Sequence, residues 1–240
     1  ALARWERGAT RVPPSEMIAA AEEAGLIVQL GYHLIDTALA AHRDLLDEGL
    51  EAGRLALNVA AAQLREPGFA RRLLAMAKRR RLRPGWLEIE VTENVVLDRS
   101  GEAIATTLRE LDAAGVSIAL DDFGTGYASL SHLKRFPVHR LKIDRSFIRN
   151  VATDCDDAII ARAIASLAHS LGMEVVAEGV ETDEQYRFVA SHGCDFAQGY
   201  LISMPMFLPE ARAYLVGRGD GAIVAAKPAG PAQPPAAAAA

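Results

Sequence analysis

One stretch of sequence decides the fold: Val116-Ser117-Ile118-Ala119-Leu120-Asp121-Asp122-Phe123-Gly124. A short apolar run bounded by acidic residues and a glycine predicts a buried β-strand, here at residues 116–120. Asp121 and Asp122 follow this strand directly. In a parallel sheet closed into a barrel, the carboxyl ends of all strands open on one face, where functional side chains gather. The stretch therefore predicts both a sheet and polar chemistry at its rim.

The rest of the chain alternates in the same way. Runs rich in Val, Ile and Leu predict further strands at residues 54–59, 86–91, 139–143, 174–177 and 196–201. Helical patterns lie at 15–24, 30–48, 67–81, 100–114, 128–135, 155–171 and 183–192. This alternation is typical of an α/β fold with βα units around a parallel sheet. Six strands are two short of a closed eight-stranded barrel, which leaves a doubly wound sheet or a barrel with missing first strands as alternatives.

The composition limits the class of protein. The chain has 240 residues, of which 50% are hydrophobic, and this length suits one domain. A formal charge of -5 argues against a nucleic-acid polymer as partner, because such binding needs a basic surface. Two cysteines without metal-like spacing fit a reducing cytoplasm, and no apolar run is long enough for membrane contact. We expect a domain at 1–218 and a disordered tail, rich in Ala and Pro, at 219–240.

Polar residues stand at or near the ends of nearly all predicted strands: Asn58, Glu90, Asp121, Asp122, Lys142, Glu178 and Gln198. Carboxylates that converge at one rim repel one another, and bound cations relieve that repulsion. Oxygen ligands without His or Cys favour Mg²⁺ or Mn²⁺ over zinc. The adjacent pair Asp121 and Asp122 suggests two ions, an arrangement that suits attack on a phosphodiester.

A glycine-containing segment follows the aspartate pair. Phe123, Gly124, Thr125 and Gly126 combine small residues with two glycines. Beside metal ligands, such a segment predicts a mobile loop whose movement links a distant event to the site.

Six motifs, in this order, resemble the EAL family of cyclic-di-GMP phosphodiesterases: Leu57-Asn58-Val59, Glu90-Val91-Thr92-Glu93, Asp121-Asp122-Phe123-Gly124-Thr125-Gly126-Tyr127, Leu141-Lys142-Ile143-Asp144, Ala177-Glu178-Gly179-Val180-Glu181 and Gln198-Gly199-Tyr200. The similarity runs from about Ala1 to Phe207. It implies a TIM-like (β/α)8 barrel whose first strand is antiparallel. The activity it implies is metal-dependent opening of cyclic-di-GMP to linear pGpG.

The resemblance also implies roles for individual residues. The expected ligands of the two Mg²⁺ or Mn²⁺ ions are Asn58, Glu90, Asp121, Asp122 and Glu178. Glu178 is expected to act as general base as well. Lys142 would hold the attacking water or a phosphate oxygen.

Further roles concern the substrate and regulation. Arg4 and Leu2 would contact the substrate, and Gln198 would lie at the mouth of the site. A guanidinium suits a phosphate because it can bind two oxygens at once. Glu93 would tether the loop after Asp122 and so couple dimerisation to metal binding.

The chain departs from the family pattern at two places. Of the motif Glu-Ala-Leu only Ala1 and Leu2 are present, so a metal-binding glutamate is expected immediately before Ala1. The first strand and most of the second are expected to precede the chain with it. Near the other end, Ile202-Ser203-Met204-Pro205 replaces the more usual aromatic and basic residues.

Two other functions stay open from the sequence. A catalytically silent receptor would use the same barrel to bind cyclic-di-GMP, although such members usually lose several of these residues. Paired carboxylates alone would also fit a barrel glycosidase. By resemblance, we expect cyclic-di-GMP as ligand, a homodimer formed through the EAL domain, and upstream sensory or GGDEF domains.

Overall fold

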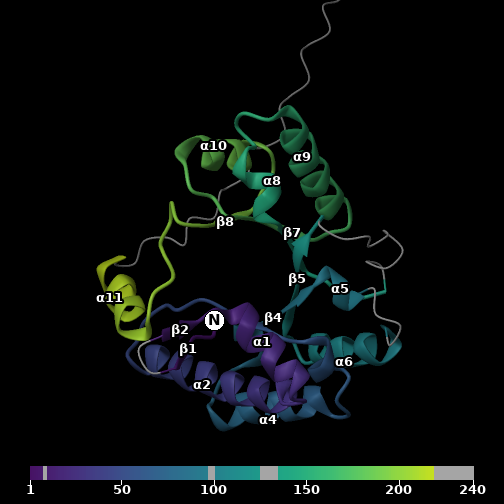
Figure 1. Ribbon diagram of the computed structural model, residues 1–240, viewed down its shortest axis with the longest axis vertical. Coiled ribbons are helices and arrows are strands. Elements are labelled where there is room, and N and C mark those ends of the chain that lie inside the picture. Colours follow the sequence, from purple (N-terminus) through teal and green to yellow (C-terminus); the bar gives the residue numbers. More distant parts are fainter. Residues whose placement is uncertain (8–9, 97–100, 125–134, 219–240) are drawn as a thin grey trace, which may run out of the picture.

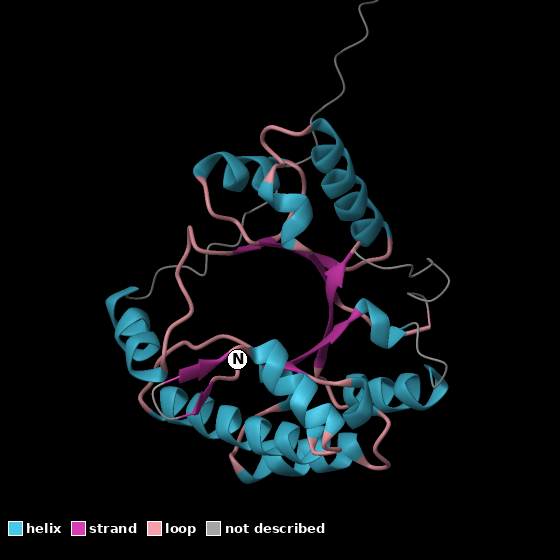
Figure 2. Ribbon diagram, viewed as in Figure 1, coloured by secondary structure: helices cyan, strands magenta, loops and turns pink. Residues whose placement is uncertain are grey.

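The computed structural model describes residues 1–7, 10–96, 101–124 and 135–218. Its centre is a parallel sheet of β3 (Leu55–Asn58), β4 (Leu87–Thr92), β5 (Ser117–Phe123), β6 (Arg140–Ile143), β7 (Glu174–Glu178) and β8 (Phe196–Gln198). These strands are paired in chain order from β3 to β8. Figures 1 and 2 show them curled into an arc with the helices outside. A doubly wound sheet reverses its strand order, so this order confirms the TIM-like barrel.

Helices connect the strands and cover the outer face of the arc. They are α2 (Ile27–Asp47), α4 (Phe69–Arg79), α6 (Gly101–Ala113), α9 (Cys155–Ser170) and α10 (Asp183–Ser191). Helix α1 (Pro14–Glu23) precedes α2 and packs against it. The sequence predicts each of them to within a few residues. The helix expected at 128–135 lies almost entirely outside the described residues. None of the helices in the described part of the chain has the length and hydropathy that a bilayer crossing requires.

The sequence did not predict several further elements. These are the antiparallel pair β1 (Trp5–Arg7) and β2 (Thr10–Val12), and α3 (Ala61–Leu64), η1 (Pro84–Trp86), α5 (Glu93–Val96), α8 (Arg145–Arg149) and α11 (Leu208–Arg218). Strand β8 is also shorter than expected, because it ends at Gln198 and the backbone turns away at Gly199. A Cβ at Gly199 would lie 2.2 Å from the Val180 carbonyl oxygen, so only glycine fits this close approach.

The alternation of β4 explains why the arc has an apolar and a polar face. Leu87, Ile89 and Val91 are buried in the core that the helices share. Successive side chains of a strand point to opposite faces, so Glu88 and Glu90 point to the concave side. Both glutamates are buried, and they lie two residues apart, with Glu88 nearer the amino end of the strand and Glu90 nearer its carboxyl end. The concave side therefore has two polar layers, one near each end of the sheet.

The lower layer, at the amino ends of the strands, is an ion-pair network around Glu88. Arg140 donates to both Glu88 carboxylate oxygens at 2.8 and 3.0 Å and to Glu174 at 2.7 Å. Ser117 donates to Glu88 at 3.2 Å, and the Arg140 guanidinium lies 4.5 Å from the centre of the Phe196 ring. This network joins β4, β5, β6, β7 and β8 at one end of the sheet.

The two edge strands of the arc are β3 and β8. The amino group of Ala1 donates to the Ala56 carbonyl oxygen at 2.5 Å, so the first residues run beside β3. Helix α11 is joined to the end of α2 by an ion pair of Arg212 with Glu48 at 2.7 Å.

We predict that Arg140→Met lowers the free energy of unfolding by about 3–5 kcal/mol, because the buried Glu88 carboxylate loses the guanidinium that is hydrogen-bonded to both of its oxygens. Urea denaturation measures the loss. The double variant Glu88→Gln with Arg140→Met should recover part of it. Arg135→Met is the matched control: its ion pair with Glu102 is exposed, so the expected loss is at most about 1 kcal/mol. Equal losses for the two arginines would contradict a buried network.

Candidate active site

The upper polar layer, at the carboxyl ends of the strands, is centred on Lys142. Its ammonium contacts Glu178 at 2.6 Å, Glu90 at 2.7 Å and Asp121 at 2.9 Å. The lysine is buried, so three carboxylates from β4, β5 and β7 meet at one cation on β6. Asp144 lies two residues after Lys142 in the sequence and could have formed an ion pair with it. Asp144 instead accepts a hydrogen bond from the Ser146 backbone and caps α8.

Strand register brings the other predicted residues to the same rim. Asn58 is paired with Glu90 in the sheet and donates to its carboxylate at 3.0 Å. Gln198 is paired with Glu178. The residues that the sequence assigns to the metal site, which come from strands far apart in the chain, therefore lie together.

An irregularity in β5 presents both aspartates at the rim. The register between β5 and β6 shifts between Leu120 and Phe123, and Asp122 has a φ of 54°. This left-handed conformation is rare for a residue other than glycine. As a result, carboxylate oxygens of Asp121, Asp122 and Glu178 lie within 4.8 Å of one another.

The pKa values of three residues in the layer around Lys142 are shifted by burial and by the neighbouring carboxylates. Burial works to lower the pKa of Lys142, but the charges of Glu90, Glu178 and Asp121 outweigh it and raise that pKa. Burial raises the pKa of Glu178 to about 7, and the charge of Asp121 adds to the effect. The pKa of Asp122 is also raised, first by burial and then by the charge of Asp121. Glu178 and Asp122 therefore keep their protons to a higher pH than isolated carboxyl groups do, because burial and neighbouring negative charge disfavour their ionised forms.

The donor set fits divalent cations. Three carboxylates, those of Glu90, Asp121 and Glu178, contact one ammonium, and the Asp122 carboxylate lies within 4.8 Å of those of Asp121 and Glu178. The ammonium cannot neutralise all of them, and a hard cation among carboxylate oxygens would. The amide of Asn58 can supply one more oxygen. Oxygen donors of this kind are the usual ligands of Mg²⁺, Mn²⁺ and Ca²⁺.

The segment after the aspartate pair is held by Glu93. This glutamate is buried at the start of α5, and its carboxylate accepts a hydrogen bond from the Gly124 backbone at 3.1 Å. Phe123 is buried at the end of β5. Thr125 and Gly126, which belong to the predicted loop, lie outside the described residues. Glu93 therefore contacts the backbone directly before this segment, and its role as a tether stays a prediction.

Two further candidates for substrate contact, Leu2 and Arg4, lie near the amino terminus of the chain. Leu2 is 62% exposed, and Arg4 is exposed and donates to the carbonyl of its neighbour Ala3 at 2.9 Å. Their roles stay predictions. Sequence reasoning did not identify helix α8 or its contacts with the segments beside the site, although Asp144 before α8 is a helix-capping signal.

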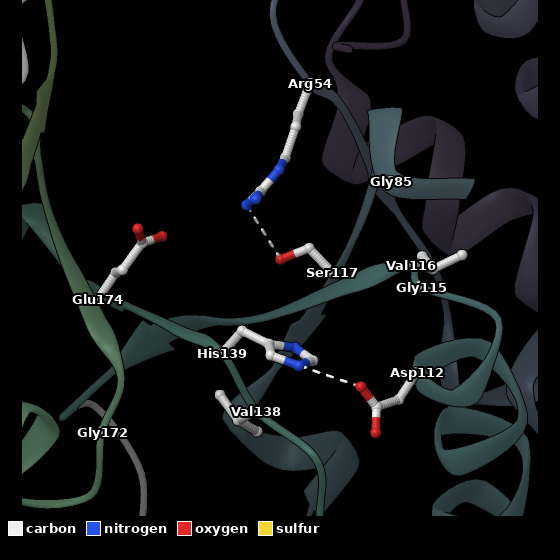
Figure 3. A pocket seen from close by; sticks show the side chains of 10 residues that line it. All are labelled: Arg54, Gly85, Asp112, Gly115, Val116, Ser117, Val138, His139, Gly172 and Glu174. Carbon is white, nitrogen blue, oxygen red and sulfur yellow. Dashed lines mark hydrogen bonds and ion pairs between the residues drawn. The ribbon is translucent and has the colours of Figure 1, made fainter. Parts of the chain in front are cut away.

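A cavity of about 390 Å³ lies at the other end of the sheet, lined by Arg54, Ser117, His139, Asp112 and Glu174 among others. Figure 3 shows Arg54 directed at Ser117 and His139 at Asp112. The Arg54 guanidinium also lies 3.8 Å from Glu88, and His139 lies 3.1 Å from Asp112. Glu88 and Glu174 are thus paired with arginines, and the Asp112 carboxylate lies beside the His139 ring, whereas at the rim three carboxylates contact the one ammonium of Lys142.

A model of the EAL domain matches residues 1–205. The chain belongs to the EAL domain family. Among curated relatives, the bifunctional diguanylate cyclase/cyclic di-GMP phosphodiesterase MucR of Pseudomonas aeruginosa is 42% identical over 207 residues, which cover 86% of this chain and 30% of that protein. The cyclic di-GMP phosphodiesterase NbdA of the same organism is 37% identical over 90% of this chain and 28% of its own length. The EAL chain thus spans less than a third of these relatives.

Solved structures agree with this family. The PaMucR phosphodiesterase in complex with c-di-GMP has a TM-score of 0.81 and 41% identity, covering 87% of this chain and 84% of that one. Klebsiella pneumoniae BlrP1, in a complex with manganese and cyclic-diGMP, has a TM-score of 0.73 and 32% identity over 81% of this chain and 49% of that one. EAL domains have therefore been crystallised with a divalent metal and the dinucleotide.

We predict that Mg²⁺ or Mn²⁺ stabilises the protein, because the cation relieves repulsion among the rim carboxylates. At a concentration 100 times the Kd, binding to the folded state adds about 2.7 kcal/mol. Thermal denaturation with and without the cation, at matched ionic strength, measures the effect. Asp122→Asn should abolish most of the gain. Asp112→Asn, at the opposite end of the sheet, should retain it, and a gain that survives in Asp122→Asn would contradict this site.

Proposed function

We propose that this EAL domain hydrolyses cyclic-di-GMP to linear pGpG with two divalent cations, Mg²⁺ or Mn²⁺. The observation that carries the proposal is the group of four carboxylates around Lys142 at the rim of the barrel. Its relatives MucR and NbdA are named as cyclic di-GMP phosphodiesterases, and PaMucR was crystallised with c-di-GMP. Hydrolysis of this messenger would lower its level in bacterial signalling.

The residues that would hold the cations are Asn58, Glu90, Asp121, Asp122 and Glu178. When bound, two cations lower the pKa of water and stabilise negative charge on phosphoryl oxygens. They also neutralise the carboxylates, which prepares the rim for an anionic substrate.

The chain's own residues would do the remaining work. In the reaction, water forms a bond to phosphorus, the bond from phosphorus to the 3′ oxygen breaks, and the 3′ oxygen takes up a proton. Glu178 would accept the proton of the attacking water. Lys142 would donate hydrogen bonds to that water or to a phosphate oxygen, and its positive charge favours both. Arg4, Leu2 and Gln198 would bind the nucleotide around this centre.

A catalytically silent receptor is the second function to consider. Such a receptor needs only to bind the dinucleotide, so it has no use for a proton acceptor beside a lysine. The presence of Lys142 and Glu178 in direct contact, at 2.6 Å, favours the enzyme. Glu93 would have a regulatory role, because its carboxylate accepts a hydrogen bond from the Gly124 backbone. Through this bond, a change in the loop after Gly124 would alter the position of Asp122.

The full protein is proposed to contain more than this domain. We propose an EAL domain at 1–218 and upstream sensory or GGDEF domains in a cytoplasmic protein. The tail expected at 219–240 lies outside the described residues. The domain would form a homodimer. Ile159 and Ile160 of α9 are 54% and 38% exposed, and a second copy of the domain would cover them.

We predict that Glu178→Gln lowers turnover by about 10²- to 10⁴-fold while cyclic-di-GMP binding persists, because the amide cannot accept the proton. Chromatographic release of pGpG with Mg²⁺ measures turnover, and calorimetry measures binding. Glu174→Gln, at the other end of the same strand, is the control and should remain active. Tight nucleotide binding without hydrolysis by the unaltered protein would favour the receptor. Release of pGpG that survives EDTA would contradict the metal-dependent mechanism.

We predict that Ile159→Glu with Ile160→Glu converts the dimer to a monomer, because charged side chains would have to be desolvated at the interface. Light scattering after size-exclusion chromatography measures the mass. Ile18→Glu changes a comparably exposed isoleucine on α1 and should leave the dimer intact. A dimer that survives the α9 changes would exclude this face.

A further inference from the structure

We infer that the short helix α8 sets the spacing between the two acidic ends that flank Lys142, and that Phe147 is a positioning residue in it. On one side of Lys142 lies the aspartate pair of β5, and on the other lies Glu178 of β7. Helix α8 starts directly after β6, the strand that carries Lys142. This inference rests on the proposed metal site and adds the elements that hold its ligands in place.

The first contact joins α8 to the Glu178 side. Gly179 follows Glu178 and has a φ of +70°. A Cβ at this glycine would lie 2.6 Å from the Arg145 Cβ and 3.4 Å from its Cα. The first turn of α8 therefore rests against the backbone next to Glu178, at a distance that only glycine allows.

The second contact joins α8 to the aspartate pair. Gly124, two residues after Asp122, has a φ of +102°. A Cβ there would lie 2.8 Å from a ring carbon of Phe147 and 3.2 Å from Ile164 of α9. The Phe147 ring thus supports the backbone that Glu93 holds from its other side.

A buried glutamine fixes the far end of α8. The Gln185 amide of α10 donates to the Arg149 carbonyl oxygen at 2.8 Å. Its own oxygen accepts from the backbone of Thr182 at 3.0 Å and of Glu181 at 2.6 Å. Gln185 is buried, so the end of α8 and the segment after Glu178 are tied to one side chain.

Together these contacts make α8 a spacer. Its first turn touches the segment after Glu178, its middle touches the segment after Asp122, and its end is bound to α10. A metal site keeps its affinity only while ligands from different strands stay at the right separation, and residues that support ligands commonly change affinity by 10- to 100-fold when altered. Loss of the Phe147 ring should therefore weaken cation binding without removing any ligand.

The test measures Mn²⁺ affinity by electron paramagnetic resonance of the free ion, a readout that does not depend on turnover. Phe147→Ala and Gly179→Ala should each weaken binding about tenfold or more. Phe147→Leu keeps an apolar side chain and should show a smaller loss. Circular dichroism establishes that each variant is folded.

Two matched controls separate spacing from general destabilisation. Phe188→Ala removes a partly buried ring on α10 that stacks on His192, away from the rim. Gly25→Ala places a side chain at nearly the same φ as Gly179, +68°, with nothing within 4 Å. Both controls should lose stability but bind Mn²⁺ as the unaltered protein does.

The outcomes are distinct. Failure of the unaltered protein to bind Mn²⁺ would overturn the proposed function, and this inference with it. Normal binding by the unaltered protein and also by Phe147→Ala and Gly179→Ala would overturn only the spacer. Equal losses in the variants and their controls would overturn it too, because stability alone would then explain the change.

Discussion

The structure depends on one buried ammonium among several carboxylates. Lys142 is the only positive charge that contacts Glu90, Asp121 and Glu178 within the described residues, and this one side chain links the ends of β4, β5, β6 and β7. The attraction that joins these strands leaves a surplus of negative charge. That surplus makes the rim suited to divalent cations and, through them, to phosphate.

The two polar layers of the concave side have opposite characters. Around Glu88, the charges of Arg140 and Glu174 and the hydroxyl of Ser117 satisfy one another, and this layer stabilises the sheet. Around Lys142 the charges do not balance. Barrel proteins generally separate stability and chemistry between the two ends of their strands, and here the separation is visible in the ion pairs themselves.

Much of this could be predicted from the sequence, for identifiable reasons. Strands such as β4 have buried runs with a strong period, and the polar residue at or near each strand end marks the rim, so Asn58, Glu90, Asp121 and Glu178 were placed correctly. Helix α8 was missed because five residues are too few for a helical period to show. The network around Arg140 was missed because pairing at the amino ends depends on register across β4, β6 and β7, which single strands do not reveal. The close approach of Phe147 to Gly124 likewise arises only in three dimensions.

The left-handed backbone of Asp122 restricts how this position can change in related genes. With a φ of 54°, it tolerates glycine and asparagine and strongly disfavours valine or isoleucine, whose branched side chains collide with the main chain. Aspartate combines tolerance of this conformation with a carboxylate. A lineage released from selection for catalysis would therefore be expected to accumulate asparagine or glycine at this position. Either residue here would then identify homologues that have lost catalytic activity.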